Sequence, residues 1–104
     1  MLTLTKGNFE DEVIKSEGLI MVDFWSEKCV PCKALMPSVH ELAEKYEGKA
    51  KFCSLDTNGN KRLAMSQKVL GLPTILFYRN GEIIAELCKE FSIGDVEDKL
   101  LELA

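Results

Sequence analysis

The most informative stretch of this chain runs Val22-Asp23-Phe24-Trp25-Ser26-Glu27-Lys28-Cys29-Val30-Pro31-Cys32-Lys33. An apolar segment, interrupted only by Asp23, enters a short turn that carries two cysteines separated by two residues, and a helical pattern begins there. A cysteine pair at this spacing can exchange disulfides, because one thiolate attacks and the other is near enough to resolve the mixed disulfide. The stretch therefore predicts a strand, a redox turn and a helix in direct succession.

Working outward from this stretch, the apolar pattern predicts alternating strands and helices. We expect strands near 2–4, at 19–25, at 51–55, at 74–78 and from 83, and helices after Asn8, over 32–46, near 61–69 and over 93–103. Asn8 is placed to cap the first helix, and Ser92 with Asp95 forms a capping-box pattern before the last. Asn80-Gly81 is the preferred type I′ hairpin turn. This order predicts an α/β fold with a largely parallel sheet and an antiparallel edge.

Size and composition restrict the function. A chain of 104 residues with 46% hydrophobic residues fits one domain with a packed core. Its net charge of −4, with no Lys/Arg run longer than two, argues against a nucleic-acid partner. The longest apolar run, Leu19–Val22, is far too short to cross a membrane. The first residues lack a signal-peptide pattern, so we expect a cytoplasmic protein, in which four cysteines do not form a structural framework.

Several short motifs together resemble the thioredoxin family along nearly the whole chain: Val-Asp-Phe-Trp at 22–25, Cys-x-Pro-Cys-Lys at 29–33, Pro37, Leu-Pro-Thr at 72–74 and Asn-Gly-Glu at 80–82. The resemblance implies the thioredoxin fold over residues 1–104 as a single domain. That fold is a five-stranded mixed sheet, in the order 1-3-2-4-5, flanked by four helices. It also implies that Pro73 is cis and faces the cysteines.

The resemblance implies a protein disulfide reductase, and the residues suggest how it would work. Cys29, at a helix N-terminus, is the expected nucleophile, helped by the nearby charges of Lys28 and Lys33, and Cys32 is the expected resolving thiol. An aspartate inside an apolar strand is costly unless it is partnered or protonated, and the resemblance makes Asp23 the proton acceptor for Cys32. No metal or organic cofactor is expected. The implied partners are a thioredoxin reductase and disulfide-containing proteins, and we expect a monomer.

The expected substrate surface surrounds the cysteines. Trp25 is expected to wall the site, and backbone groups of Leu72 and Thr74, beside Pro73, could pair with an extended substrate. The remaining expected contacts include the positions at which the chain departs from the family: Lys28 where a second Trp is usual, Val30-Pro31 for Gly-Pro, and Cys88-Lys89-Glu90 where a Gly is usual.

A further departure lies near the buried aspartate, and the charged departures predict a change in partners. Ser54 stands where the family often has a Lys near the buried aspartate. Charges at Lys28, Lys89 and Glu90 predict a narrower set of partners and a dedicated reductase with an acidic contact near Lys28.

Other interpretations of the cysteines remain open from the sequence. Zinc would need two further ligands, for which the candidates are His40, Cys53 and Cys88, although none belongs to a second Cys-x-x-Cys. We expect Cys53 to be a core residue and Cys88 to be a buried strand-end thiol on the rim facing Cys29, and we assign His40 no role. A glutaredoxin, a secreted oxidase and a non-catalytic binding scaffold are the alternative functions. The first lacks its Cys-Pro-Tyr-Cys motif, and the second lacks a His between the cysteines.

Overall fold

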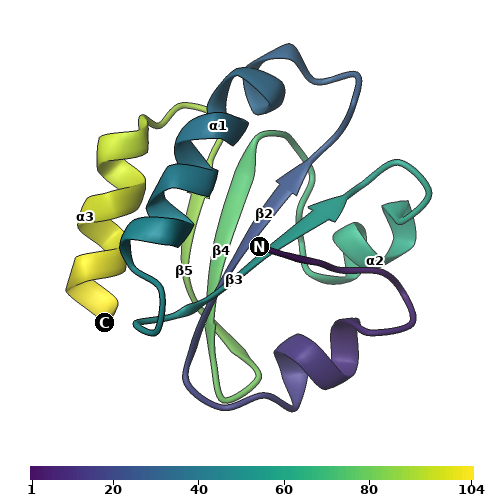
Figure 1. Cartoon of the computed structure of the whole chain (residues 1–104). Helices are drawn as coiled ribbons and strands as arrows, with labels where there is room; N and C mark the ends of the chain where they lie inside the picture. The colour runs from purple at the N-terminus through teal and green to yellow at the C-terminus, as the bar shows by residue number, and fades with distance from the viewer.

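The computed structural model describes residues 1–104 and shows one sheet with helices on both faces (Figure 1). The strands are β1 Leu2–Thr3, β2 Leu19–Trp25, β3 Lys51–Asp56, β4 Thr74–Arg79 and β5 Glu82–Cys88. The helices are η1 Glu10–Ile14, α1 Val30–Lys45, α2 Lys61–Ser66 and α3 Ile93–Leu103. No helix is long and apolar enough to cross a membrane.

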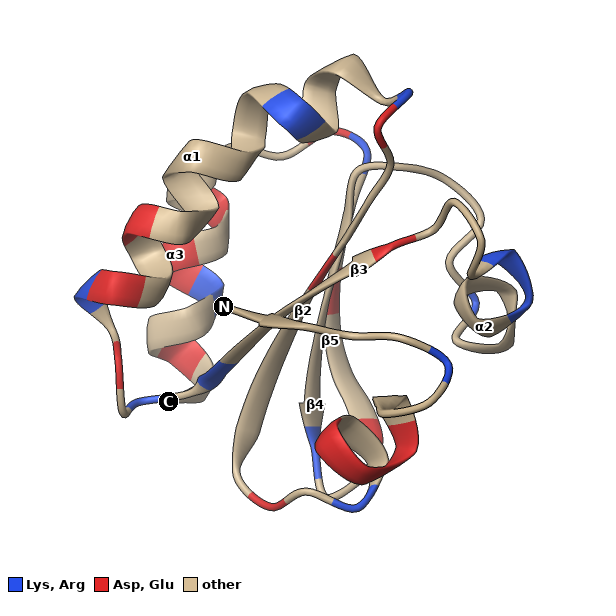
Figure 2. Cartoon of the chain, turned by 45° about the vertical axis from the view of Figure 1, so that its right-hand side comes forward, with Lys and Arg blue, Asp and Glu red and all other residues tan.

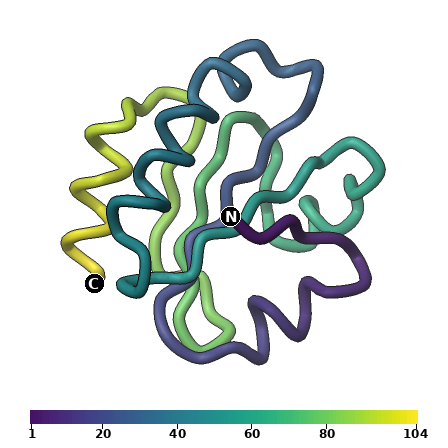
Figure 3. Tube along the Cα trace, viewed as in Figure 1, coloured from purple at the N-terminus to yellow at the C-terminus, as the bar shows by residue number.

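The sheet has the order β1-β3-β2-β4-β5, which confirms the predicted fold. β1 and β2 run parallel to β3, whereas β4 is antiparallel to both β2 and β5. In this register Thr74, the first residue of β4, pairs with Phe24 near the end of β2. The segment before β4 therefore meets the turn after β2 at one end of the sheet, as the backbone trace in Figure 3 shows. We call this the redox end, and the opposite end, with the β4–β5 turn, the hairpin end.

Alternate residues of β2 face opposite cores, so this central strand is buried on both sides. Ile20, Val22 and Phe24 belong to a core shared with η1 and α2. Leu19 and Met21 belong to a second core, beneath α1 and α3. Because side chains of a strand alternate, Asp23 and Trp25 point toward the side of the sheet that α1 covers.

Helix α1 begins where the sequence pattern places it. Cys29 is the N-cap residue, and Pro31 occupies the first turn, where a missing N–H breaks no helical hydrogen bond. The helix continues through Pro37 to Lys45. Its inward face carries Cys32, Val39 and Leu42, all buried, so the predicted periodicity is confirmed.

Local predictions are confirmed at the hairpin end and at α3, but one is wrong near the N-terminus. Asn80 and Gly81 have φ values of 54° and 79°, as a type I′ turn requires. Both hydrogen bonds of the Ser92/Asp95 capping box are present. Asn8 caps no helix: its side chain accepts from the Thr5 N–H and donates to the Thr3 carbonyl. The segment after it, Glu10–Ile14, has π-helical geometry.

Candidate active site

The two cysteines form a disulfide at the start of α1, with 5.3 Å between their Cα atoms. The Cys32 backbone N–H donates to Cys29 Sγ at 3.3 Å, so the free amides of the first helical turn face this sulfur. A sulfur in that position is stabilised as a thiolate by the amides and by the helix dipole. The two sulfurs differ in access: Cys29 is half-buried, whereas Cys32 is only 1% exposed. The outer sulfur is thus the one that another protein can reach.

Asp23 lies on the same side of the sheet as α1 and is 1% exposed. Its Oδ2 atom has no hydrogen-bond partner, and the loss of hydration raises the pKa of this carboxyl from 3.8 to about 7. A carboxyl with that pKa can both accept and release a proton near neutral pH. The expectation that this aspartate is buried is therefore confirmed, and the structure gives it no stabilising partner.

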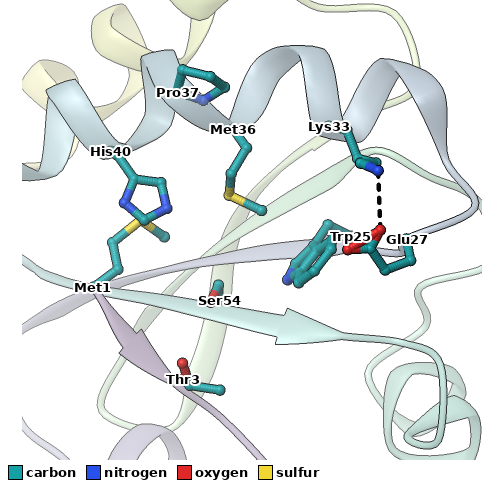
Figure 4. Close-up of a pocket in the computed structure, with 9 residues that line it drawn as sticks. All are labelled: Met1, Thr3, Trp25, Glu27, Lys33, Met36, Pro37, His40 and Ser54. Carbon is teal, nitrogen blue, oxygen red and sulfur yellow. Dashed lines mark ion pairs between the residues drawn. The ribbon is translucent and has the colours of Figure 1, made fainter.

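Ser54 pairs directly with Asp23 across β2 and β3. The position at which the family often has a lysine is thus filled by a neutral hydroxyl beside the buried carboxyl. Ser54 also lines a cavity of about 540 Å³ between α1 and the β1–β3 edge of the sheet, together with Trp25 and Met36 (Figure 4). Trp25 is half-buried in this wall, below the first turns of α1. Met36 is a cavity-lining residue that the sequence analysis did not single out.

The segment before β4 lies at the redox end beside the cysteine turn. The Leu72–Pro73 peptide bond is cis, and Pro73 and Thr74 are buried while Leu72 is half-buried. The Pro73 carbonyl accepts a hydrogen bond from the Lys89 N–H at 2.8 Å. This bond ties the end of β5 to the proline segment. An ideal Cβ on Gly71 would lie 2.3 Å from Lys89 Cε, so the lysine side chain rests against this glycine.

Two expectations about charge and burial need correction. Cys88 is exposed, not buried, because β5 is an edge strand whose outer residues no helix covers. Its sulfur lies 3.5 Å from Thr74 Oγ1. Lys33 does not add free positive charge to the site, because its Nζ lies 3.0 Å from a Glu27 carboxylate oxygen.

The other predicted positions are placed as follows. Lys28, Val30 and Pro31 are exposed beside the disulfide, and the Val30 side chain is 77% exposed. Cys53 is fully buried in the core, as expected, and burial raises the pKa of its thiol to about 11. No three His, Cys, Asp or Glu side chains come together as a metal site would require, so His40, Cys53 and Cys88 do not complete a zinc site with the pair.

Comparison with known proteins agrees with this geometry. The thioredoxin family model matches residues 1–101. A thioredoxin of Peptoclostridium acidaminophilum is 50% identical over 97% of this chain and 92% of its own length. A thioredoxin of Acetoanaerobium sticklandii is 51% identical over 86% of each chain, and one of Pseudomonas aeruginosa is 35% identical over 82% of this chain and 79% of its own. The chain belongs to the thioredoxin family.

Proposed function

We propose that Cys29 and Cys32 carry out the disulfide exchange of this protein, with Asp23 as the proton acceptor. Thioredoxins are protein disulfide oxidoreductases, and as a member of the family this chain is one. The observation that supports the residue roles is the unequal access of the two bonded sulfurs: Cys29 is half-buried at the helix N-cap, and Cys32 is 1% exposed beneath it.

The exchange proceeds in two displacements. The Cys29 thiolate attacks one sulfur of a target disulfide, which breaks and releases the other target sulfur as a thiolate. Cys32 then gives its proton to Asp23 and attacks Cys29 Sγ. The second target sulfur leaves, and the Cys29–Cys32 disulfide forms. The target has gained two electrons, and the protein has lost two.

The ionisation of Asp23 controls the second displacement. Only the carboxylate can accept a proton, and with a pKa of about 7 roughly half of the molecules hold it near neutral pH. After the exchange the carboxyl must release this proton again. The cavity lined by Ser54 and Trp25 reaches the neighbouring position of the sheet from outside.

The family relationship also suggests which proteins this chain binds and in which cellular compartment it works. Members of this family are reduced by thioredoxin reductase, so we expect such a reductase to return two electrons to the disulfide, with no cofactor held by the chain itself. Targets would contact Val30 and Pro31 and pair with the Leu72–Thr74 segment. We propose a cytoplasmic, monomeric, single-domain protein. The thiols of Cys53 and Cys88 are both free, as is usual in a reducing compartment.

The substitution Cys32→Ser tests the residue roles. Without the resolving thiol, Cys29 should remain joined to its target, so non-reducing gels of the variant mixed with a protein disulfide should show covalent adducts. The matched control is Cys29→Ser, which should form none. Carrying both variants in a background with Cys53→Ala and Cys88→Ser excludes adducts through the other thiols. Adducts that depend on Cys53 or Cys88 would contradict the assignment of the nucleophile.

A further inference from the structure

The largest cavity of the molecule lies between α1 and the β1–β3 edge of the sheet, and we call it the α1 cavity. Its volume of about 540 Å³ is in the range of sites that bind small molecules. In Figure 4, Trp25 lies at one end of the cavity, Met1 and His40 lie at the other, and Met36 reaches from α1 into the space between them. The lining surface is mainly apolar, and the Ser54 hydroxyl is one of its few polar groups. Such a cavity suits a ligand with an apolar body.

An unpaired carboxyl lies directly behind the wall of the α1 cavity. Asp23 pairs with Ser54 across the sheet and precedes Trp25 by two residues, so all three side chains are on the side that α1 covers. Asp23 is 1% exposed, and its Oδ2 atom has no hydrogen-bond partner. A buried carboxylate without a partner is stabilised by a cation that comes close to it, because the attraction is strong in a region of low dielectric constant.

The charged side chains that line the α1 cavity supply no such cation. Lys33 is the basic lining residue, and its Nζ lies 3.0 Å from a carboxylate oxygen of Glu27, which also lines the cavity. The Asp23 carboxylate is therefore the unbalanced charge. The indole of Trp25 favours a cation as well, since the face of an aromatic ring attracts an ammonium group. This end of the cavity is complementary to an organic cation.

A second, acidic hollow of about 340 Å³ adjoins the α1 cavity, and we call it the outer hollow. Met1 and His40 border both spaces. The outer hollow is lined by Glu44 and Glu47, which are exposed and form no ion pair, and no Lys or Arg lines it. Figure 2 shows acidic positions along these later turns of α1, whereas α2 carries only basic ones. Unpaired carboxylates thus lie near both ends of one mainly apolar space.

We propose that the α1 cavity and the outer hollow together bind an aliphatic diamine or polyamine. One ammonium group would lie beside Trp25 and Ser54, close to the Asp23 carboxylate. The other would meet Glu44 and Glu47, and the methylene chain would follow the apolar surface between them. The proposal goes beyond the disulfide exchange, which needs no such ligand.

The spacing of the carboxylates sets the length of the ligand. Met36, in the α1 cavity, and Glu44, in the outer hollow, are about 12 Å apart along α1, since each helical residue adds about 1.5 Å. An extended chain of about eight methylene groups spans this length. A much shorter diamine cannot reach both ends, and a monoamine or a diol lacks one or both charges. Non-specific attraction to an acidic protein would show no such preference for length.

The test titrates the full-length, oxidised protein with octane-1,8-diamine at pH 8 and measures the Kd by calorimetry. At this pH Asp23, with a pKa of about 7, is mostly ionised. The comparison ligands are propane-1,3-diamine, octylamine and octane-1,8-diol. The variants are Glu44→Gln with Glu47→Gln at the outer end, and Asp23→Asn and Ser54→Lys at the inner end. The matched control is Glu41→Gln, at an exposed glutamate of α1 that lines neither hollow.

We expect octane-1,8-diamine to bind at least about tenfold more tightly than each comparison ligand. Asp23→Asn should weaken binding about tenfold, because the charge that it removes is buried. Ser54→Lys should weaken it at least as much, since the lysine brings its own ammonium group into the cavity. The double glutamine variant should lose about three- to fivefold, as is usual for exposed charges, and Glu41→Gln should bind like the wild type. In carbon-13 NMR, the bound diamine should lower the pKa of the Asp23 carboxyl.

Several results would overturn the proposal. These are the absence of saturable binding, equal affinity for the short diamine or the diol, and an equal loss of affinity in Glu41→Gln. Unchanged affinity in both Asp23→Asn and Ser54→Lys would place the ligand elsewhere and would overturn it too. Because the titration contains no target disulfide, a failure here leaves the proposed function intact, and the adduct experiment with Cys32→Ser tests that function separately.

Discussion

The two ends of the sheet differ in how well their residues suit the local backbone conformation and burial. At the hairpin end, the left-handed backbone conformations fall on Asn80 and Gly81, residue types that adopt them readily. The partly buried Arg79 guanidinium there donates to the Leu103 carbonyl at the end of α3. At the redox end, Lys89 holds a φ of 63°, and Asp23 has a buried oxygen with no partner.

The difference shows where the chain carries residues that are not the most stable ones for their positions. Lysine at a positive φ and an unpaired buried carboxyl both destabilise the folded state. Both lie at the end that carries the disulfide. At the redox end, groups that must react or meet a partner depart from the locally most stable choice, whereas at the hairpin end the residues suit their backbone. Lys68, after α2, also holds a positive φ. Substitutions at the two ends should therefore have opposite effects on stability.

The largest effect is expected for Asp23→Asn, which removes the proton acceptor and keeps the shape. Loss of a general base should slow the resolution of the mixed disulfide by about 10²–10⁴-fold, while the first attack by Cys29 changes little. Stopped-flow measurement of the two phases with a fluorescent disulfide substrate separates the steps. Equal slowing of both phases would show that Asp23 has no specific part in resolution.

The same residue should make stability depend on pH. Folding raises the pKa of Asp23 from 3.8 to about 7, so the folded state favours the protonated carboxyl. Its contribution to stability is fully present below about pH 4 and is lost as the pH rises through 7. This loss amounts to about 4 kcal/mol at 1.36 kcal/mol per pH unit. In urea unfolding at pH 4, 6 and 8, the free energy of unfolding of Asp23→Asn should increase relative to that of the wild type as the pH rises. A constant difference between the two would contradict this.

At the hairpin end, Gly81→Ala should destabilise the protein by about 2–3 kcal/mol. Its φ of 79° is unfavourable for alanine, and a Cβ there would lie 2.7 Å from the Ile14 carbonyl oxygen. Gly18→Ala is the matched control: the φ is 82°, but no atom lies within 4 Å of the added methyl group. It should cost only about 1 kcal/mol, for the backbone conformation alone. Equal losses in thermal unfolding would mean that the contact with Ile14 relaxes freely.

The smallest effect is expected at the redox end, for Lys89→Gly. Glycine should relieve the strained conformation and stabilise the protein by about 1 kcal/mol, the reverse of the hairpin result. Lys68→Gly, at a φ of 65°, should give a similar gain. Only Lys89 rests on Gly71, so only its substitution should change the KM for protein disulfides and the salt dependence of that KM. Identical kinetics for the two variants would remove Lys89 from the partner surface.

The sequence predicted the features that depend on local pattern. The buried strand at 19–25, the turn at Asn80-Gly81 and the Ser92/Asp95 capping box are all present, because each is specified by neighbouring residues. Only a few sheet arrangements are compatible with the predicted elements, since parallel strands must be joined by helical crossovers.

What the sequence left undetermined depends on contacts between distant or exposed residues. Nothing local shows that Lys33 pairs with Glu27, or that β5 leaves Cys88 uncovered. Asn8 is of a residue type that often caps helices, but its side chain forms hydrogen bonds with the preceding backbone of Thr3 and Thr5. The cationic side of α2 was visible in principle, as a 25-residue stretch without a carboxylate from 57 to 81. The fold places only the α2 part of that stretch near the proline segment, whereas Arg79 lies at the hairpin end.

The uneven charge of the chain has a practical consequence for immobilisation. On an amine-coated electrode or an anion-exchange bead, the acidic helices α1 and α3 should adhere, since the α2 side is repelled by the same coating. Figure 2 shows Asp and Glu positions along α3, along the later turns of α1 and in η1, whereas α2 carries only basic ones. The adsorbed layer would then present its disulfides outward in a common orientation, without a tag or a chemical linker.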